Sequence, residues 1–278
     1  MHDELACRAE RIRGAHIHLD IASVGATENI MLTSAISEGT TVITNAAREP
    51  EILDLQIFLN GMGADIQGAQ TGTVVINGVK KLHAAEHRVM PDRIVAGTYL
   101  TAAAITGGEL NLTHVEPPVL YPVMAKLTEM GCVFKESERA VKINAPPRLK
   151  PLPRLITEPH PGFPTDMQAQ TVAALTLAEG VSVVKECIFN ERNKHVPELI
   201  RMGADITMTD SATFVIRGRP KLEGTAVHAK ELRGGAALIL AGLAAEGETL
   251  VKDASYVERG YEEIEKALAS VGGDIEKI

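Results

Sequence analysis

One proline-rich segment of the sequence, residues 158–170, places a hydroxyl and a carboxylate side by side. Three prolines and His160 precede Thr165 and Asp166. Because proline fixes its own backbone φ angle, the segment should hold the following side chains in defined orientations. A rigidly held carboxylate is suited to accept a proton as a general base. The simpler interpretation is that Thr165 and Asp166 only cap a following helix, and for either residue alone capping is the better interpretation.

These residues belong to one copy of a fourfold sequence repeat. Each copy has a helix-like run that ends in a glycine, then a β-rich run, and then a second helix-like run that ends in another glycine. The second glycines are about 70 residues apart and are Gly63, Gly131, Gly203 and Gly272. A repeat of this regularity indicates one supersecondary unit that has been copied, with copies that pack on each other. Residues at one offset in different copies can then converge on one site.

Two offsets within the repeat carry charged residues. The first offset lies at the start of the first helix and holds Gly25, Ile94, Asp166 and Arg233. Free N–H groups and the positive end of the helix dipole make such a position an anion site. The second offset opens the second helix and holds Glu51, Leu120, Arg192 and Arg259. Paired guanidinium groups suit an anionic ligand, although surface salt bridges with Glu191 or Glu258 are a serious alternative.

The elements that position these residues should alternate between strand and helix. The repeats cover residues 14–86, 87–150, 157–224 and 225–278, and in the first we expect helices at 26–37 and 51–61. The first helices of the later repeats, at 94–105, 173–177 and 236–243, are apolar nearly all round. Helices of this composition should be buried on all sides. The sequence therefore predicts an α/β fold with helices inside and sheets outside.

Composition excludes several classes of function. The chain has 278 residues, 45% of them hydrophobic but only 3% aromatic, and a formal charge of −8. This balance argues against nucleic-acid and anionic-membrane partners. Three cysteines without a paired spacing indicate a reducing compartment, so we expect a cytoplasmic protein. We find no phosphate-binding loop, dinucleotide fingerprint or zinc spacing, and we predict neither a metal nor a cofactor.

With these residues in hand, the chain resembles the UDP-N-acetylglucosamine 1-carboxyvinyltransferase family of enolpyruvyl transferases. The resemblance begins near Arg13 and covers the later two thirds of a family member. It rests on residues 23–27, 45–51, 91–93, 163–170, 195–199 and 259–261.

The resemblance implies an inside-out α/β barrel with four of six repeats present. Residues 1–13 would be an unmatched N-terminal remnant, residues 14–89 the last repeat of an N-terminal domain, and residues 90–278 a C-terminal domain of three repeats. Ligands would bind between the two domains. The reaction implied is transfer of the enolpyruvyl group of phosphoenolpyruvate to the 3′-hydroxyl of UDP-N-acetylglucosamine, the first committed step of peptidoglycan precursor synthesis.

The resemblance also assigns roles to individual residues. Asp166 would be the base on the sugar hydroxyl, and Arg259 a second catalytic residue. Arg233 and Arg259 would contact phosphoenolpyruvate in a cleft that Arg93 and Arg192 also line. The remaining substrate-binding residues would be Ala22, Ser23, Val24, Gly25, Glu49, Thr165 and Ile188.

The part of the family pattern that lies upstream of this chain includes the loop with the proton-donating cysteine, and Cys7 lies outside the match. We therefore expect that the chain alone is incomplete, and that it self-associates or pairs with the missing N-terminal portion. Two alternatives are a non-catalytic UDP-sugar-binding remnant and a 3-phosphoshikimate 1-carboxyvinyltransferase. A further alternative is a purely structural repeat protein. It does not explain why prolines hold Asp166 in a defined orientation.

Overall fold

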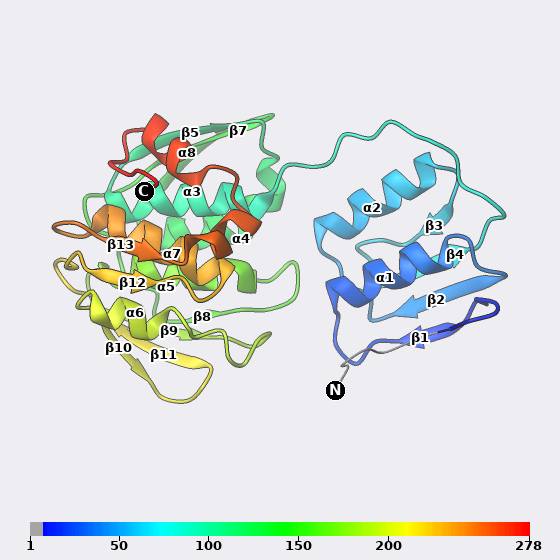
Figure 1. Cartoon of the computed structure of the whole chain (residues 1–278), viewed down its shortest axis with the longest axis horizontal. Helices are drawn as coiled ribbons and strands as arrows, with labels where there is room; N and C mark the ends of the chain where they lie inside the picture. The colour runs from blue at the N-terminus through cyan, green and yellow to red at the C-terminus, as the bar shows by residue number, and fades with distance from the viewer. Residues whose placement is uncertain (1–7) are drawn as a thin grey trace. The chain divides into compact units, whose positions relative to one another are not determined.

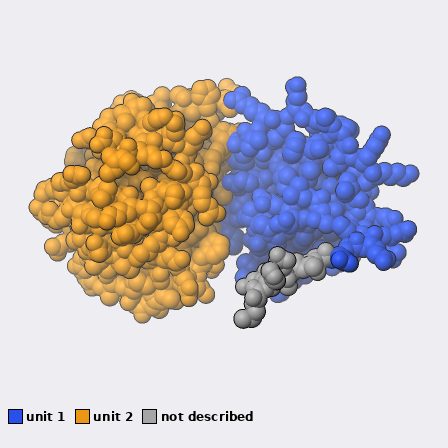
Figure 2. Space-filling view, in the orientation of Figure 1, with its two compact units in different colours: residues 1–90, 159–161 blue, residues 91–158, 162–278 orange. Residues whose placement is uncertain are grey.

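The computed structural model describes residues 8–278, so Cys7 and the rest of the first seven residues of the expected remnant lie outside the described residues. The chain divides into two compact units (Figure 2). Unit 1 comprises residues 1–90 and 159–161, and unit 2 comprises residues 91–158 and 162–278. Each unit is described by itself below.

Unit 1 contains one repeat, built as a four-stranded sheet with two helices. The sheet order is β1-β2-β4-β3, in which β1 and β2 are parallel and the other pairs are antiparallel. The alternating buried residues of β2 and β4, such as Ile43 and Val74, face Met31 and Ile52 of the helices in one small core. The elements are β1 (His16–His18), α1 (Val24–Ser34), β2 (Thr40–Thr44), α2 (Pro50–Gly61), β3 (Asp65–Gln67) and β4 (Thr73–Asn77).

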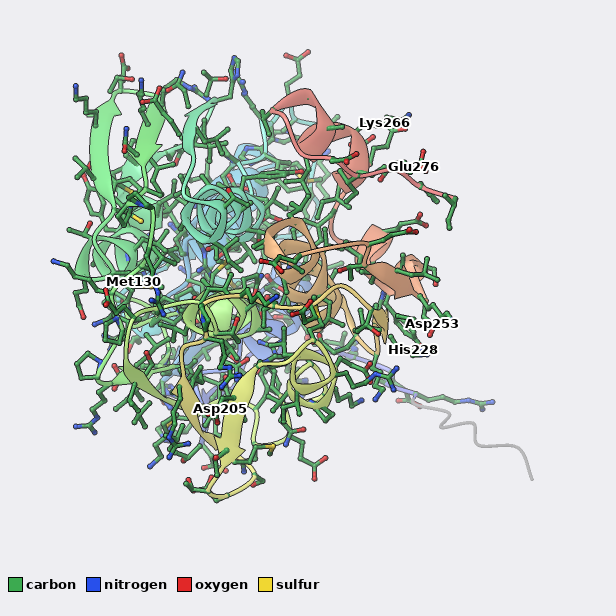
Figure 3. All side chains as sticks on the ribbon, turned by 90° about the vertical axis from the view of Figure 1, so that its left-hand side faces the viewer. Met130, Asp205, His228, Asp253, Lys266 and Glu276 are labelled. Carbon is green, nitrogen blue, oxygen red and sulfur yellow. The ribbon has the colours of Figure 1, made fainter. Side chains whose placement is uncertain are left out.

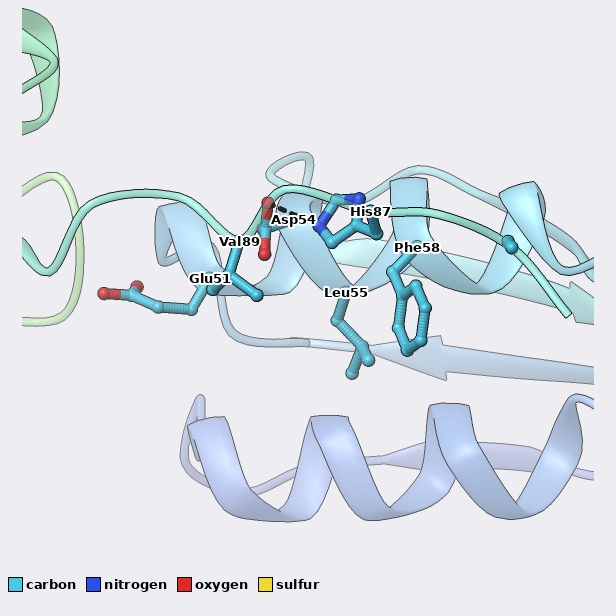
Figure 4. Close-up of a pocket in the computed structure, with 7 residues that line it drawn as sticks. Glu51, Asp54, Leu55, Phe58, His87 and Val89 are labelled. Carbon is cyan, nitrogen blue, oxygen red and sulfur yellow. Dashed lines mark hydrogen bonds and ion pairs between the residues drawn. The ribbon is translucent and has the colours of Figure 1, made fainter. Parts of the chain in front are cut away.

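The segment that leaves unit 1 is fixed along helix α2. His87 lies 3.1 Å from the carboxylate of Asp54, and its ring centroid is 5.2 Å from that of Phe58 (Figure 4). Glu51, Leu55, Ala85 and Val89 complete the lining of a shallow groove there. Apolar side chains elsewhere in unit 1 stay in solvent: Ile21, Leu32, Ile36 and Ile57 are each at least half exposed. These exposed side chains accord with the expected self-association, which stays a prediction.

Unit 2 contains the other three repeats. The second repeat comprises α3 (Arg93–Thr106), β5 (Glu109–Thr113), α4 (Pro117–Glu129), β6 (Val133–Ser137) and β7 (Ala140–Asn144). The third comprises β8 (Leu155–Ile156), the 3₁₀ helix η1 (Thr165–Met167), α5 (Gln168–Leu175), β9 (Val181–Lys185), α6 (Val196–Arg201), β10 (Asp205–Met208) and β11 (Thr213–Arg217). The fourth comprises β12 (Ala226–His228), α7 (Leu232–Ala244), β13 (Leu250–Lys252), the 3₁₀ helix η2 (Ala254–Arg259) and α8 (Ile264–Ser270).

The first helices of the three repeats form the centre of unit 2. Helices α3, α5 and α7 pack against one another in all three pairings. All eight residues of α5 are buried, and the middle of α7 is buried as well. The sheets β5-β7-β6, β10-β11-β9-β8 and β12-β13 lie around these helices (Figures 1 and 3). This packing confirms the predicted inside-out α/β arrangement. Its physical reason is that helices without a polar face are stable only when they are buried on all sides.

The repeat glycines end helices as predicted. Gly63, Gly131, Gly203 and Gly272 all have positive φ angles, between 90° and 102°. This is the left-handed conformation that lets the chain leave a helix, and glycine adopts it without a steric penalty.

The prediction that Arg192 and Arg259 open the second helices is wrong. Helix α6 begins only at Val196, and Arg192 lies in the turns that precede it. Arg259 is the last residue of η2, and α8 begins at Ile264 after Glu263 has adopted a positive φ angle. Proline favours the first turn of a helix, so Pro197 selects the later start of α6.

No helix among residues 8–278 is long and apolar enough to cross a membrane. The same residues contain no group of three or more histidine, cysteine or acidic side chains that could hold a metal ion.

Candidate functional site in unit 2

One carboxylate and two guanidinium groups meet in unit 2. Arg192 Nη1 donates to Asp166 Oδ1 at 2.7 Å. Arg233 Nη2 and Nε donate to Asp166 Oδ2 at 2.9 Å and 3.2 Å. The Asp166 side chain is 34% exposed, against 18% for Arg192 and 12% for Arg233. The carboxylate therefore lies at the solvent-facing edge of two largely buried cations.

Asp166 and Arg233 are each positioned by the start of a central helix, whereas Arg192 lies in the turns before α6. Asp166 lies in η1, directly before α5, after Pro164. Arg233 lies in the first turn of α7, where the carboxylate of Glu231 accepts the backbone N–H groups of Arg233 and Gly234. An added Cβ at Gly234 would lie 2.4 Å from the Glu231 carboxylate and 3.1 Å from His195 Cβ, so both side chains would have to shift. The equivalent position in two repeats thus brings an acid and an arginine together.

The Thr165 hydroxyl connects Arg192 to a buried acid. Arg192 Nη1 also donates to Thr165 Oγ1, at 2.8 Å. Thr165 Oγ1 in turn donates to Glu186 Oε2, at 2.9 Å. Glu186 is only 2% exposed, and its other oxygen accepts the backbone N–H of Ile188 at 2.8 Å. Ile188, which the resemblance places on the sugar side, is therefore joined to the cluster through its backbone.

A second buried network supports Arg233. Arg233 Nη1 donates to the Tyr261 hydroxyl at 3.3 Å, and the Tyr261 side chain is fully buried. Thr98 uses its hydroxyl hydrogen on the carbonyl of Ile94, at 2.8 Å. Tyr261 must then donate to Thr98, 2.9 Å away, while Gln170 Nε2 donates to both hydroxyls. This network orders every hydrogen around Tyr261 and holds the Arg233 guanidinium in place.

The charges of the two arginines determine the pKa of Asp166. Burial alone would raise the pKa of this carboxyl, but the nearby charges of Arg233 and Arg192 and their hydrogen bonds outweigh burial and hold it below its usual value. In this arrangement Asp166 is an ionised and fully engaged carboxylate.

His195 lies beneath this site as a neutral side chain. It is 2% exposed, and neither ring nitrogen has a hydrogen-bond partner among the described residues. Burial, followed by the charge of Arg192, lowers the pKa of His195 to about 3.

We expect this histidine to make the protein less stable in mild acid. Between pH 6.5 and about 3 the unfolded chain binds a proton at His195 that the folded chain does not. The free energy of unfolding should therefore fall by about 1.4 kcal/mol per pH unit below pH 6.5, and be unaffected by His195 above it. Urea unfolding at pH 7 and pH 5 measures the effect. In His195→Leu the difference between the two pH values should shrink by about 2 kcal/mol, and an unchanged difference would contradict the assignment.

The other two predicted arginines of unit 2 are Arg259 and Arg93. Arg259 is exposed, and among residues 8–278 no hydrogen bond or ion pair joins it to Asp166. Arg93 is half-buried as the first residue of α3.

The predicted residues of unit 1 lie at the starts of its two helices. Ser23 is the N-cap of α1 and accepts the backbone N–H of Ala26 at 3.3 Å, while Val24 and Gly25 form the first turn and Ala22 precedes it. Glu49 precedes α2, and its carboxylate accepts the backbone N–H of Arg48 at 3.0 Å. Ser23 therefore caps α1.

Two residues of the site were missed in the sequence. Glu186 lies at the end of a β-rich run and Tyr261 follows Arg259, so neither falls at a repeat offset that carried other charges. The available signal for Glu186 was one acid directly after the strand β9, which is weak. Tyr261 belongs to residues 259–261, which carry part of the resemblance, but no role was predicted for it.

Comparison with known proteins shows the family of the chain. The family model for EPSP synthase (3-phosphoshikimate 1-carboxyvinyltransferase) matches residues 2–268. UDP-N-acetylglucosamine 1-carboxyvinyltransferase 2 of Caldanaerobacter subterraneus is 54% identical over 99% of this chain and 66% of its own length. UDP-N-acetylglucosamine 1-carboxyvinyltransferase 1 of Symbiobacterium thermophilum is 51% identical over 96% of this chain and 60% of its own length. The chain thus spans somewhat less than two thirds of the curated relatives it matches.

Solved structures share the fold. The enolpyruvyl transferase NikO from Streptomyces tendae superimposes with a TM-score of 0.87 at 26% identity, over 96% of this chain and 66% of that one. The resemblance to UDP-N-acetylglucosamine 1-carboxyvinyltransferases is confirmed by the sequence relatives. By the family model and these relatives together, the chain belongs to the EPSP synthase family of carboxyvinyl transferases.

Proposed function

We propose that this chain takes part in carboxyvinyl transfer from phosphoenolpyruvate to the 3′-hydroxyl of UDP-N-acetylglucosamine, in the cytoplasm and as a step of peptidoglycan synthesis. The observation that carries the proposal is the Asp166 carboxylate held between Arg192 and Arg233. This reaction requires a carboxylate that can accept a hydroxyl proton and cations that can bind a phosphate or a carboxylate. Relatives that are 51–54% identical bear the name of this activity.

The chemistry balances with Asp166 as the base. As the sugar hydroxyl oxygen forms a bond to C2 of phosphoenolpyruvate, its proton passes to Asp166 and a proton is added at C3. The carbon–oxygen bond to phosphate then breaks, inorganic phosphate leaves, and loss of a proton from C3 restores the vinyl group. The acid that serves C3 would come, by the resemblance, from a part of the family chain upstream of this one.

The depressed pKa of Asp166 gives the anionic substrate a second role. While both arginines hold Asp166, the carboxylate is a poor proton acceptor. A phosphate or carboxylate of the substrate that engages Arg233 competes for its N–H groups. The pKa of Asp166 then rises towards the ordinary range, and the base becomes active when the substrate is bound.

The other predicted contacts stay part of the proposal. Arg259 and Arg93 would bind the anionic substrate, and Thr165 and Ile188 would lie near the sugar. Ala22, Ser23, Val24 and Gly25 would bind the UDP-sugar. Glu49 would support the site. The partners are these two small molecules.

Release of inorganic phosphate tests the proposal. The chain is incubated with phosphoenolpyruvate and UDP-N-acetylglucosamine, alone and with the N-terminal segment of a relative added as a separate polypeptide. We expect phosphate release only with both substrates and with the added segment. Release by the chain alone would refute the need for that segment.

The same assay separates the alternatives. Binding of UDP-N-acetylglucosamine without release under any condition would favour a non-catalytic sugar-binding role. Turnover with shikimate 3-phosphate in place of the nucleotide sugar would favour the branch after which the family model is named.

A further inference from the structure

Both arginines that hold Asp166 lie over an aromatic ring. Arg192 Cζ is 4.8 Å from the centroid of the Phe189 ring, and Arg233 Cζ is 5.6 Å from that of Tyr261. Both distances are within the range of a cation–π interaction, about 6 Å. The chain has only five phenylalanines, four tyrosines and no tryptophan. Aromatic rings are therefore scarce in this protein, yet both arginines of the site have one.

A short turn places Phe189 beside Arg192. The backbone N–H of Arg192 donates to the carbonyl of Phe189 at 3.0 Å, which closes the turn between them. At the start of the turn the backbone N–H of Phe189 donates to Glu186 Oε1 at 3.0 Å, and at its end Gln168 Nε2 donates to the carbonyl of Arg192 at 3.3 Å. The Phe189 side chain is 54% exposed. The backbone of the turn, rather than burial in the core, thus holds this ring against the guanidinium group.

The ring and the hydrogen-bond partners of Arg192 act on the guanidinium group in different ways. Thr165 Oγ1 and Asp166 Oδ1 both accept from one nitrogen, Nη1, at 2.8 Å and 2.7 Å. The ring attracts the positive charge as a whole and requires no particular N–H group. An anion that competes with Asp166 for the N–H groups therefore need not displace the ring. Arg192 can keep this partner while its hydrogen-bond partners are exchanged.

We propose that Phe189 is a positioning residue of this site: its ring keeps the Arg192 guanidinium in place while hydrogen bonds to Asp166 are exchanged for bonds to an anionic ligand. The inference rests on the proposed function only for the identity of that ligand, which would be a phosphate or a carboxylate. The exposed Phe189 tests the idea better than Tyr261, because the buried Tyr261 hydroxyl also serves the network around Thr98 and Gln170.

The experiment compares Phe189→Leu, which removes the aromatic face but keeps an apolar side chain, with Phe189→Tyr, which keeps the face. Calorimetric titration with inorganic phosphate should show an affinity about two- to fivefold weaker in Phe189→Leu, the size of an exposed cation–π contact, and the wild-type affinity in Phe189→Tyr. In the ligand-free protein, ¹⁵N relaxation should show a more mobile Arg192 Nε–H group in Phe189→Leu than in the wild type or Phe189→Tyr. Neither measurement requires turnover.

Tyr121→Leu is the matched control. Tyr121 lies in α4, is 49% exposed and donates to Glu136 at 3.1 Å, so its loss should change neither the phosphate affinity nor the motion of Arg192. The same result in Tyr121→Leu as in Phe189→Leu would overturn the proposal, and so would an equally large loss in Phe189→Tyr.

Two other outcomes would also overturn the proposal. One is an unchanged phosphate affinity together with unchanged Arg192 motion in Phe189→Leu. The other is a loss of affinity for UDP-N-acetylglucosamine alone, which would show that the ring contacts the sugar nucleotide directly. If the wild-type protein binds no phosphate, the anion site of the proposed function is wrong, and the motion of Arg192 alone then decides whether Phe189 positions it.

Discussion

Asp166→Asn is expected to lower the rate of phosphate release by about 10²–10⁴-fold, the usual contribution of a general base. The same variant should bind inorganic phosphate more tightly, by roughly tenfold. In the wild type, Arg192 and Arg233 donate their N–H groups to the Asp166 carboxylate. The neutral amide of asparagine binds them less strongly, so they become available to an external anion. Loss of turnover together with a gain in anion affinity separates a base from a merely structural carboxylate.

Calorimetric titration with phosphate and the phosphate-release assay measure the two effects. Asp205→Asn is the matched control, since Asp205 is a 42% exposed residue of β10 that lies 3.7 Å from Arg217 (Figure 3). Exposed ion pairs of this kind contribute little, so neither quantity should change. If Asp166→Asn instead weakened phosphate binding, Asp166 would be needed to hold the arginines in a binding geometry, and the account of competition given above would be wrong.

Gly218→Ala is expected to destabilise unit 2 by at least about 3 kcal/mol. Gly218 follows β11, and its backbone N–H donates to the carbonyl of Gly180 at 2.9 Å. A Cβ at this position would lie 1.6 Å from the carbonyl oxygen of Ala178, which belongs to the backbone and cannot rotate away. Either the strand or the end of the preceding helical turn must move.

Urea unfolding compares this variant with Gly108→Ala. A Cβ at Gly108 would meet its nearest atom at 3.5 Å, an ordinary contact, so this control should stay within about 1 kcal/mol of the wild type. Equal stabilities of the two variants would show that the corner at Gly218 can relax. The equivalent glycine of the first repeat, Gly78, makes the same approach to Ser37, at 1.8 Å.

Much of the fold could be predicted because the repeat supplies the same information four times. Apolar runs such as those in α3 and α7 predict central helices, and the glycine after each second helix predicts a left-handed residue. Counting offsets also pairs Asp166 with Arg233, since the two begin equivalent helices. The close approach of Gly218 to Ala178 was not predicted. The only trace of such a backbone contact in the sequence is a single glycine after a strand.

The arginines of the second offset show where counting fails. Arg192 reaches Asp166 from turns before α6, whereas Arg259 ends a 3₁₀ helix and is exposed. The two positions share an offset but not a backbone conformation, and the direction of a long side chain depends on the backbone. Glu186 could not be predicted for a related reason, because its contact with Thr165 depends on the direction that the end of β9 gives to its side chain.

The hydroxyl of Tyr261 is a junction between modules that arose as copies. It joins the fourth repeat to Thr98 of the second and Gln170 of the third. In a linear array each module contacts only its neighbours, so unfolding can spread one module at a time. Here three modules pack around a shared centre. None of them can unfold without removing hydrogen-bond partners from the other two. Unit 2 should accordingly melt as one block, in spite of its modular ancestry.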